Sequence, residues 1–473
     1  MMGLGASAQT AVPITPVVSA PDNPRPQGPP VPVSLAEVVA LALRDNRTIR
    51  SAYLDRVAQK FDLVVANSRF QPRINLAADV FSSRLSGVTA LRSTVSPTVT
   101  WRAPTGATAQ FVWTRADRLD GPGGRAETTS LVVAQPLLRG GGFATNLAPL
   151  RIAALQNQIN RLNLETTVSN IVTSVVFAYR SLLQAQEQAR LSQLALERTQ
   201  AIVGTSQALI DAGRMAAADI VQAESGVANQ QVAVIQAGQQ VRSTQLALLQ
   251  LVAVDPRTNI VAGDAITVTR LPIDVERAVV LGLDARMDVL AQRKALEQNR
   301  QSLIVAKNNR LWDVSVVGTL DRSTGRDPLL GPIDGRTNRT VGVQLNVPIG
   351  EPAFRQGEIQ ATTNLRTAEL RYEDLLQAAE TQVRDAVQAA DATWLQVEAA
   401  RRAQSLAQRA LDIQREKLKV GRSSNFEVLS FQADLRAADT QALTAEIAYL
   451  NALTSLDQQL GSTIATWQIE VND

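Results

Sequence analysis

Two stretches of the chain keep apolar residues three and four positions apart over an unusual length. In residues 148–211 these positions include Leu155, Ile159, Leu162, Val168, Ile171 and Val175, and in the second half they are Val383, Val387, Ala390, Trp394 and Val397. Such spacing puts the apolar side chains on one stripe of a helix and is typical of helices that pack along one another. A helix of about 60 residues would be ~90 Å long at 1.5 Å per residue. We therefore predict an elongated helical body.

Other short stretches alternate between apolar and polar residues, which is the pattern of strands with one apolar face. The apolar members are Ile74, Leu76 and Val80 in the first half, and Val314, Val316, Leu320, Val341, Val343 and Leu345 in the second. Runs of roughly 9–11 residues have the length of a tilted membrane-spanning strand. Four aromatic residues in or beside these runs suit an aromatic belt at the membrane surface, and they are Phe81, Trp101, Trp113 and Trp312. Aromatic packing inside a soluble sheet is the alternative.

The order of these elements occurs twice along the chain. Residues 34–49 align with 274–289 at a shift of 240, and the turns "AGR" at 212–214 and "VGR" at 420–422 align at 208. We predict a first repeat over 34–255, a linker over 256–273 and a second repeat over 274–468. Each repeat has a leading helix, two strands and a helical hairpin that turns near Gly213 or Gly421. The expected strands are 73–84, 127–136, 313–322 and 339–348.

An additional hairpin is predicted in the first repeat, over residues 94–103 and 106–116 around "APTGA". It has no counterpart in the second repeat, and we expect it to extend beyond the membrane or to lengthen the neighbouring strands. Four strands per chain cannot close a membrane barrel, because the smallest such barrels have about eight. An open sheet edge is also not tolerated in lipid. Strands that cross a membrane would therefore require several copies of the chain.

Composition removes several function classes. The 473 residues include no cysteine and no histidine, so thiol chemistry, structural zinc and histidine-based acid–base catalysis are excluded. The chain has no phosphate-binding loop and no dinucleotide-binding glycine pattern. We expect no enzyme activity and no cofactor. The net charge of +3 is nearly balanced and gives no reason to expect a nucleic-acid partner.

The N-terminal segment, residues 1–33, differs in composition from the rest. Ala6, Ser7 and Ala8 have the small-x-small form of a signal-peptidase site, although a charged start and an apolar core are missing. We interpret this segment as the remnant of a signal peptide followed by a proline-rich, disordered stretch. A disordered tail with chance alanines is the alternative.

From Ser34 to about Gln468 the chain resembles the TolC-like outer-membrane efflux proteins, which are the outer-membrane factors of tripartite efflux and type I secretion systems. The resemblance is carried by the duplicated element order, "VAQPLLRGGG" at 133–142, "LNVPIG" at 345–350 and the two glycine–arginine turns. It implies a mainly α fold with a membrane β-barrel. Three chains would form a twelve-stranded barrel in the outer membrane of a Gram-negative-type bacterium, continued by a coiled-coil α-helical tunnel through the periplasm.

The resemblance also implies partners and site residues. A periplasmic adaptor protein would contact the tips at Gly213, Arg214, Val420, Gly421, Arg422 and Ser423. Asp219 and Glu427 match acidic positions that narrow the tunnel, and three copies of Glu427 would favour cations. The family's gate tyrosine and arginine fall on Leu418 and Ser423, and a second acidic ring falls on Ser430. The closed-state network must therefore differ here, and Arg422 is a candidate to hold it.

The function predicted from these features is a passive export duct. The duct would serve an inner-membrane pump or ABC transporter, with the lipid bilayer and two further copies of the chain as its other partners. The competing hypothesis is a non-conducting structural coiled-coil protein of the periplasm or cell surface. That hypothesis predicts extraction without detergent.

Overall fold

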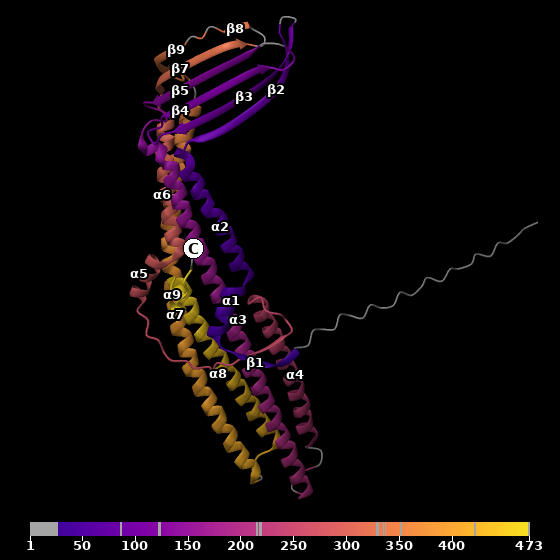
Figure 1. Ribbon diagram of the computed structural model, residues 1–473. Helices are drawn as coiled ribbons and strands as arrows, with labels where there is room; N and C mark the ends of the chain where they lie inside the picture. The colour runs from indigo at the N-terminus through magenta and orange to yellow at the C-terminus, as the bar shows by residue number, and fades with distance from the viewer. Residues whose placement is uncertain are drawn as a thin grey trace, which may run out of the picture.

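The computed structural model describes residues 27–85, 88–121, 124–213, 216, 220–327, 331–333, 335, 337–350, 352–420 and 422–471. Figure 1 shows an elongated molecule with a β-sheet at one end and a body of long helices that extends away from it. Arg214, Asp219 and Gly421 lie outside the described residues, as do residues 1–26 with the expected signal remnant.

Long helices form the body. They are α1 (Leu35–Asp45), α2 (Arg47–Asn67), α3 (Phe143–Asp211), α4 (Ile220–Leu251), α5 (Val275–Ala285), α6 (Met287–Asn309), α7 (Ala353–Lys419) and α8 (Asn425–Leu460), followed by the short α9 (Thr463–Thr466). α3 packs along α4, and α7 packs along α8. The predicted stripe on α7 is confirmed, since Val383, Val387, Ala390 and Val397 are buried and Trp394 packs edge-on against Tyr449. Within the described ranges, no helix combines the length and hydropathy that crossing a membrane requires.

The helix boundaries repeat at the shift of 240 residues. Ser34 caps α1 and Asp274 caps α5, in both cases by accepting from the backbone N–H three residues later. Asn46 separates α1 from α2, and Arg286 separates α5 from α6 with nearly the same extended backbone. Since side-chain caps satisfy the first free N–H groups of a helix, the two repeats begin their helices by the same local chemistry.

Six long strands form one antiparallel sheet in the order β2–β3–β4–β5–β7–β9, and the short β8 (Gly331–Ile333) pairs with the end of β7. The six are β2 (Arg73–Leu85), β3 (Val88–Arg102), β4 (Thr108–Arg118), β5 (Arg125–Pro136), β7 (Asp313–Asp327) and β9 (Thr337–Asn346). The prediction of two sheet strands in the first repeat plus a separate hairpin is therefore wrong. β3 and β4 lie between β2 and β5, because the hairpin's alternating pattern continues the same ladder of backbone hydrogen bonds.

The sheet has one apolar face and one polar face, which follow from the strand registers and the two-residue period of side chains. The apolar face carries Ile74, Leu76, Val80, Val95, Val99, Phe111, Leu131, Val133, Val316, Leu320, Val341, Val343 and Leu345. On the polar face Ser96 Oγ donates to Thr114 Oγ1 (3.1 Å), and Ser130 Oγ donates to Asp321 Oδ1 (2.6 Å). Trp101 and Trp113 fall on the apolar side, and Trp312 directly precedes β7. Phe81 falls on the polar side, so the structure does not group it with Trp101 and Trp113.

The segment before α1 also differs from the prediction. Residues 27–33 are not disordered: they form β1 (Gln27–Val33), which pairs in parallel with β6 (Thr258–Ala262) from the predicted linker. Proline is compatible with an extended edge strand, where a missing N–H costs no ladder bond. Ile260 and Ala262 pack against the apolar core made by α1, α3 and the end of α4. The linker is therefore tied to the helical body.

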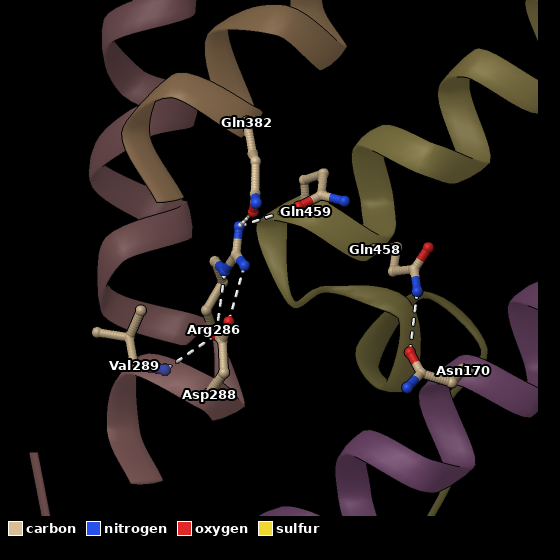
Figure 2. Close-up of polar contacts among 7 residues, drawn as sticks. All are labelled: Asn170, Arg286, Asp288, Val289, Gln382, Gln458 and Gln459. Atoms are coloured by element: carbon tan, nitrogen blue, oxygen red, sulfur yellow. Dashed lines mark hydrogen bonds and ion pairs between the residues drawn. The ribbon is translucent and has the colours of Figure 1, made fainter. Parts of the chain in front are cut away.

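A polar junction fixes the start of the second repeat to α7 and α8. Figure 2 shows Arg286 donating through Nη1 to Gln382 Oε1 (2.8 Å) and Gln459 Oε1 (2.9 Å). The same guanidinium donates through Nε and Nη2 to the two carboxylate oxygens of Asp288 (3.1 and 2.8 Å). Nearby, Gln458 of α8 donates to Asn170 of α3 (2.9 Å). These contacts join helices of both repeats midway along the body.

Candidate functional site at the helical tips

The first tip is the turn that follows α3. Gly213 has φ +68°, and its N–H donates to Ile210 O at 2.9 Å. A left-handed residue directly after a helix is the usual way to end it, and glycine adopts that conformation without steric cost. Among the described residues, apart from its direct chain neighbours, none places an atom within 4 Å of where a Cβ would be. The predicted role of Gly213 in the reversal is confirmed, and its requirement is conformational.

The second tip joins α7 to α8. The Arg422 N–H donates to Lys417 O at 2.8 Å, which is the six-residue closure of a Schellman C-cap. Ser424 then caps α8: its side chain accepts from the Glu427 N–H (3.2 Å), while Glu427 Oε2 accepts from the Ser424 N–H (3.2 Å). This reciprocal pair is a capping box. It is written in the sequence as Ser-x-x-Glu.

Glu427 is held by more than the capping box. Its Oε2 also accepts from Ser423 Oγ (2.8 Å) and from Gln414 Nε2 (2.9 Å), and Gln414 Nε2 donates to Ser423 Oγ as well (2.9 Å). Hydrogen bonds from Ser423 and the Ser424 N–H lower the pKa of the Glu427 carboxyl from its ordinary value. The side chain remains exposed and ionised at neutral pH. Ser423 thus belongs to a hydrogen-bonded network at the family's gate positions.

An apolar core lies directly behind the tips. It contains Ile202, Ala223, Leu411, Leu418, Val428 and Leu435. Leu418, which the resemblance aligns with the family's gate tyrosine, is 7% exposed and packs into this core. The two hairpins are joined beside it by Asn425, whose side chain donates to Ser206 Oγ at 2.6 Å. Sequence reasoning missed Gln414, Ser206 and Asn425, because nothing local to each residue indicates its partner.

A groove of about 1040 Å³ runs between the end of α3 and the end of α7. Its walls include Ile413 and Val420, whose exposed fractions are 57% and 65%. The basic side chains along it are Arg198, Arg415, Lys417, Lys419 and Arg422, against the acidic Asp412 and Glu416. Lys419 pairs with Glu416 at 2.7 Å. The groove therefore presents apolar surface with a surplus of positive charge.

Farther from the tips, a partly buried arginine links the hairpins. Arg180 of α3 donates to Leu450 O (2.6 Å), Thr454 Oγ1 (2.7 Å) and Asn451 Oδ1 (3.3 Å) of α8. Burial lowers its pKa to about 10, which leaves the guanidinium charged at neutral pH. Movement of one hairpin relative to the other would break these hydrogen bonds unless α3 and α8 move together at this point.

The predicted site residues thus divide between the two ends of the molecule. Gly213 follows the end of α3, and Val420, Arg422, Ser423 and Glu427 lie where α7 ends and α8 begins. Figure 1 shows the ends of these helices at the opposite end of the molecule from the sheet. Trp101 and Trp113 lie in the strands β3 and β4, and Trp312 directly precedes β7. The tip residues present hydrogen-bonding and charged groups to a partner. No described residue among them forms a catalytic pair of nucleophile and base.

Comparison with known proteins relates the chain to one family. Residues 38–254 match the family model described as outer membrane efflux protein. The outer membrane efflux protein BepC of Brucella suis biovar 1 is 26% identical over 331 residues, which are 67% of this chain and 71% of that protein.

Solved channels share the fold. The CmeC outer membrane channel of Campylobacter jejuni matches with a TM-score of 0.69 at 17% identity, covering 91% of this chain and 86% of that one. The outer membrane protein VceC of Vibrio cholerae matches with a TM-score of 0.70 at 17% identity, covering 90% and 96%. At these identities the structural likeness shows the fold. The predicted resemblance is confirmed by the family model and the curated relative together.

Proposed function

This chain is a relative of the outer membrane efflux proteins, and from that premise we propose that three copies form a passive export duct. The relation supports an outer-membrane location and a channel role in place of an enzyme activity. In the proposed assembly each chain contributes both of its repeats, 34–255 and 274–468. The duct would receive cargo from an inner-membrane pump or a type I secretion transporter and would bind no nucleotide itself.

The observation that carries the proposal is the two-faced sheet at one end of the helical body. Ile74, Leu76, Val341 and Val343 on its apolar face are 68–83% exposed in the single chain. A surface of this kind is stable against lipid, whereas the opposite face pairs hydroxyl and carboxyl groups and suits a water-filled interior. The sheet is joined directly to α2, α3, α6 and α7, so the helices continue the same wall into the periplasm.

The tips form the proposed docking site for a periplasmic adaptor. Each chain presents two hairpin turns, and three chains would present six around one ring. Exposed Ile413 and Val420 give the groove apolar contact area, and the arginine and lysine side chains can donate to carbonyl or carboxylate groups of the adaptor. In this proposal Gly213, Arg214, Val420, Gly421, Arg422 and Ser423 contact the adaptor.

Glu427 is the proposed determinant of ion selectivity at the narrow end. Three copies of an exposed carboxylate around a narrow opening set a negative potential that favours cations. The capping network holds each carboxylate at a defined height on α8. Asp219 is proposed as a second contributor from the first tip.

Planar-bilayer recording of the detergent-purified protein tests the duct. We expect a small, cation-selective conductance, and Glu427→Gln should weaken the selectivity while the trimer persists. If the ion selectivity of the conductance does not change with this substitution, the constriction lies elsewhere along the tunnel. A protein that stays in solution without detergent and forms no channel would restore the structural coiled-coil hypothesis.

Cross-linking tests the adaptor contact. Because the chain has no cysteine, Ser423→Cys or Gly213→Cys introduces a single thiol at one tip. A bifunctional thiol–amine reagent should then join the protein to an adaptor of the host. Leu54→Cys, on an exposed position of α2 far from the tips, is the matched control. Equal yields from tip and control positions would contradict the docking site.

A further inference from the structure

The sheet has six long strands, with the short β8 beside the end of β7, and two outer edges. β2 pairs only with β3, and β9 pairs only with β7, among the described residues. The strands alternate in direction, so β2 runs away from the helices and β9 runs back toward them. The β9 edge of one copy is therefore antiparallel to the β2 edge of the next. An antiparallel sheet continues across this boundary without a change of pattern.

The side chains at the two edges match as well. Ile74, Leu76 and Val80 on β2 lie on the same face of the sheet as Val341, Val343 and Leu345 on β9. All six are at least 61% exposed. Pairing the edges head to tail keeps these six side chains on the same side of the wall. It also removes the open backbone groups that lipid does not tolerate.

We propose that the assembled membrane wall contains eighteen strands, six from each of three chains, and that the β3–β4 hairpin widens it beyond the twelve-stranded wall first predicted. This inference rests on the proposed trimer for the number of copies. The number of strands in each copy comes from the sheet itself. The partner at each edge is a second copy of this chain.

The hairpin is built into the wall at its helical end. Its turn, residues 103–107, lies against the loop between β5 and α3: Gly142 N donates to Thr105 O (3.0 Å), and Thr105 Oγ1 donates to Gln135 Oε1 (3.1 Å). Gly106 has φ +97°, and a Cβ there would lie 2.1 Å from Gly140 O. Only glycine fits such an approach. Because this turn is packed against the junction between sheet and helices, the hairpin cannot extend beyond the membrane as an independent arm.

The wall and the tunnel therefore have different strand and helix counts. In each chain the ends of four helices (α2, α3, α6 and α7) meet the sheet, whereas the sheet itself has six long strands. With strands about 4.8 Å apart and tilted by about 40°, eighteen strands close at a diameter of about 36 Å and twelve at about 24 Å. The outer-membrane segment would then be about 1.5 times wider than a twelve-stranded one. The constriction of the duct lies away from the membrane.

Paired cysteine substitutions test whether β3 and β4 are part of the wall. Val95→Cys and Phe111→Cys place a thiol on the apolar face, and Thr94→Cys and Gln110→Cys place one on the polar face. Val343→Cys and Gln344→Cys on β9 serve as the reference pair. In proteoliposomes, a membrane-impermeant maleimide should label only the polar-face member of each pair. Top views by electron microscopy should show a wall with a diameter of about 36 Å.

The outcomes separate this inference from the proposed function. If β9 alternates but both faces of β3 and β4 are labelled, and the wall measures about 24 Å, the channel stands and the eighteen-stranded wall is refuted. If β9 does not alternate and no trimer forms, both proposals fail. As a second variant, deletion of residues 88–118 leaves β2 antiparallel to β5. It should assemble with a wall about two thirds as wide, and an unchanged width would also overturn the inference.

Discussion

Two substitutions at the second tip separate the structural role of the Ser424–Glu427 pair from its electrostatic role. Ser424→Ala removes the acceptor for the Glu427 N–H, while Glu427→Gln keeps a side chain that can complete the capping box but removes its charge. The first change should affect the stability of the start of α8. The second should affect ions that pass the tip.

The expected size follows from the cap. Replacing a serine N-cap by alanine costs about 1 kcal/mol. This is a roughly fivefold change in an opening equilibrium, since 1.4 kcal/mol is tenfold. Val428 and Leu435 anchor the rest of α8 in the tip core, so the loss is confined to the first turns. Opening remains local, as in other helix ends.

Hydrogen–deuterium exchange followed by mass spectrometry measures this directly. Peptides covering 424–435 should exchange about five times faster in Ser424→Ala, and peptides from the middle of α8 should be unchanged. Glu427→Gln should accelerate exchange less than Ser424→Ala does, because glutamine can keep the capping hydrogen bond without the charge, and it should reduce cation selectivity in bilayers. Equal exchange in all three proteins, or acceleration only in Glu427→Gln, would refute the capping account of this tip.

Three further predictions concern other contacts. Arg286→Met should weaken the junction of α5 and α6 with α7 and α8 by about 2 kcal/mol, because hydrogen bonds to charged groups contribute about 1.5–3 kcal/mol. Faster hydrogen exchange in residues 275–290 would show this loss. The double variant with Arg286→Met and Asp288→Asn should recover part of it. Gly213→Ala should destabilise the left-handed turn by about 1–2 kcal/mol and raise hydrogen exchange in residues 205–211. Gly213→Asn should have a smaller effect. Equal exchange in the two variants would contradict the conformational account. The lowered pKa of Glu427 means that its contribution is present above the ordinary value of 4.5 and is lost as the pH falls through the lower folded-state pKa. A spin label at Val420 should therefore become more mobile on acidification in the unmodified protein and less so in Glu427→Gln.

Much of the fold follows from local patterns in the chain. The spacing on α7 predicts which side is buried, because a helix repeats every 3.6 residues whatever its neighbours are. The alternation in β7 and β9 predicts their apolar face for the same reason, with a period of two. Gly213 and Ser424 also act through their own backbone or through residues within one turn. For these features, sequence and structure agree.

Other features depend on partners that are distant in sequence. The alternation of apolar and polar residues in β3 and β4 predicts that they are strands. It does not predict which strands they pair with, because the hydrogen bonds between strands are made by backbone groups that every residue carries. Only the tertiary structure inserts this hairpin between β2 and β5. It likewise pairs β1 with β6 across 229 residues or more. No local periodicity encodes either choice.

The site divides in the same way. The duplicated glycine–arginine turns located the tips, since a helix reversal has a local signature. The groups that surround Glu427 and join the hairpins have no such local signature. Gln414 of α7 donates to Glu427, and Asn425 donates to Ser206, which lies 219 residues away in the sequence. The sequence alone determined the elements, their faces and the turns, because these depend on neighbours along the chain. The tertiary structure decided the neighbours of each strand and the partners of each polar group, because those depend on packing between distant segments.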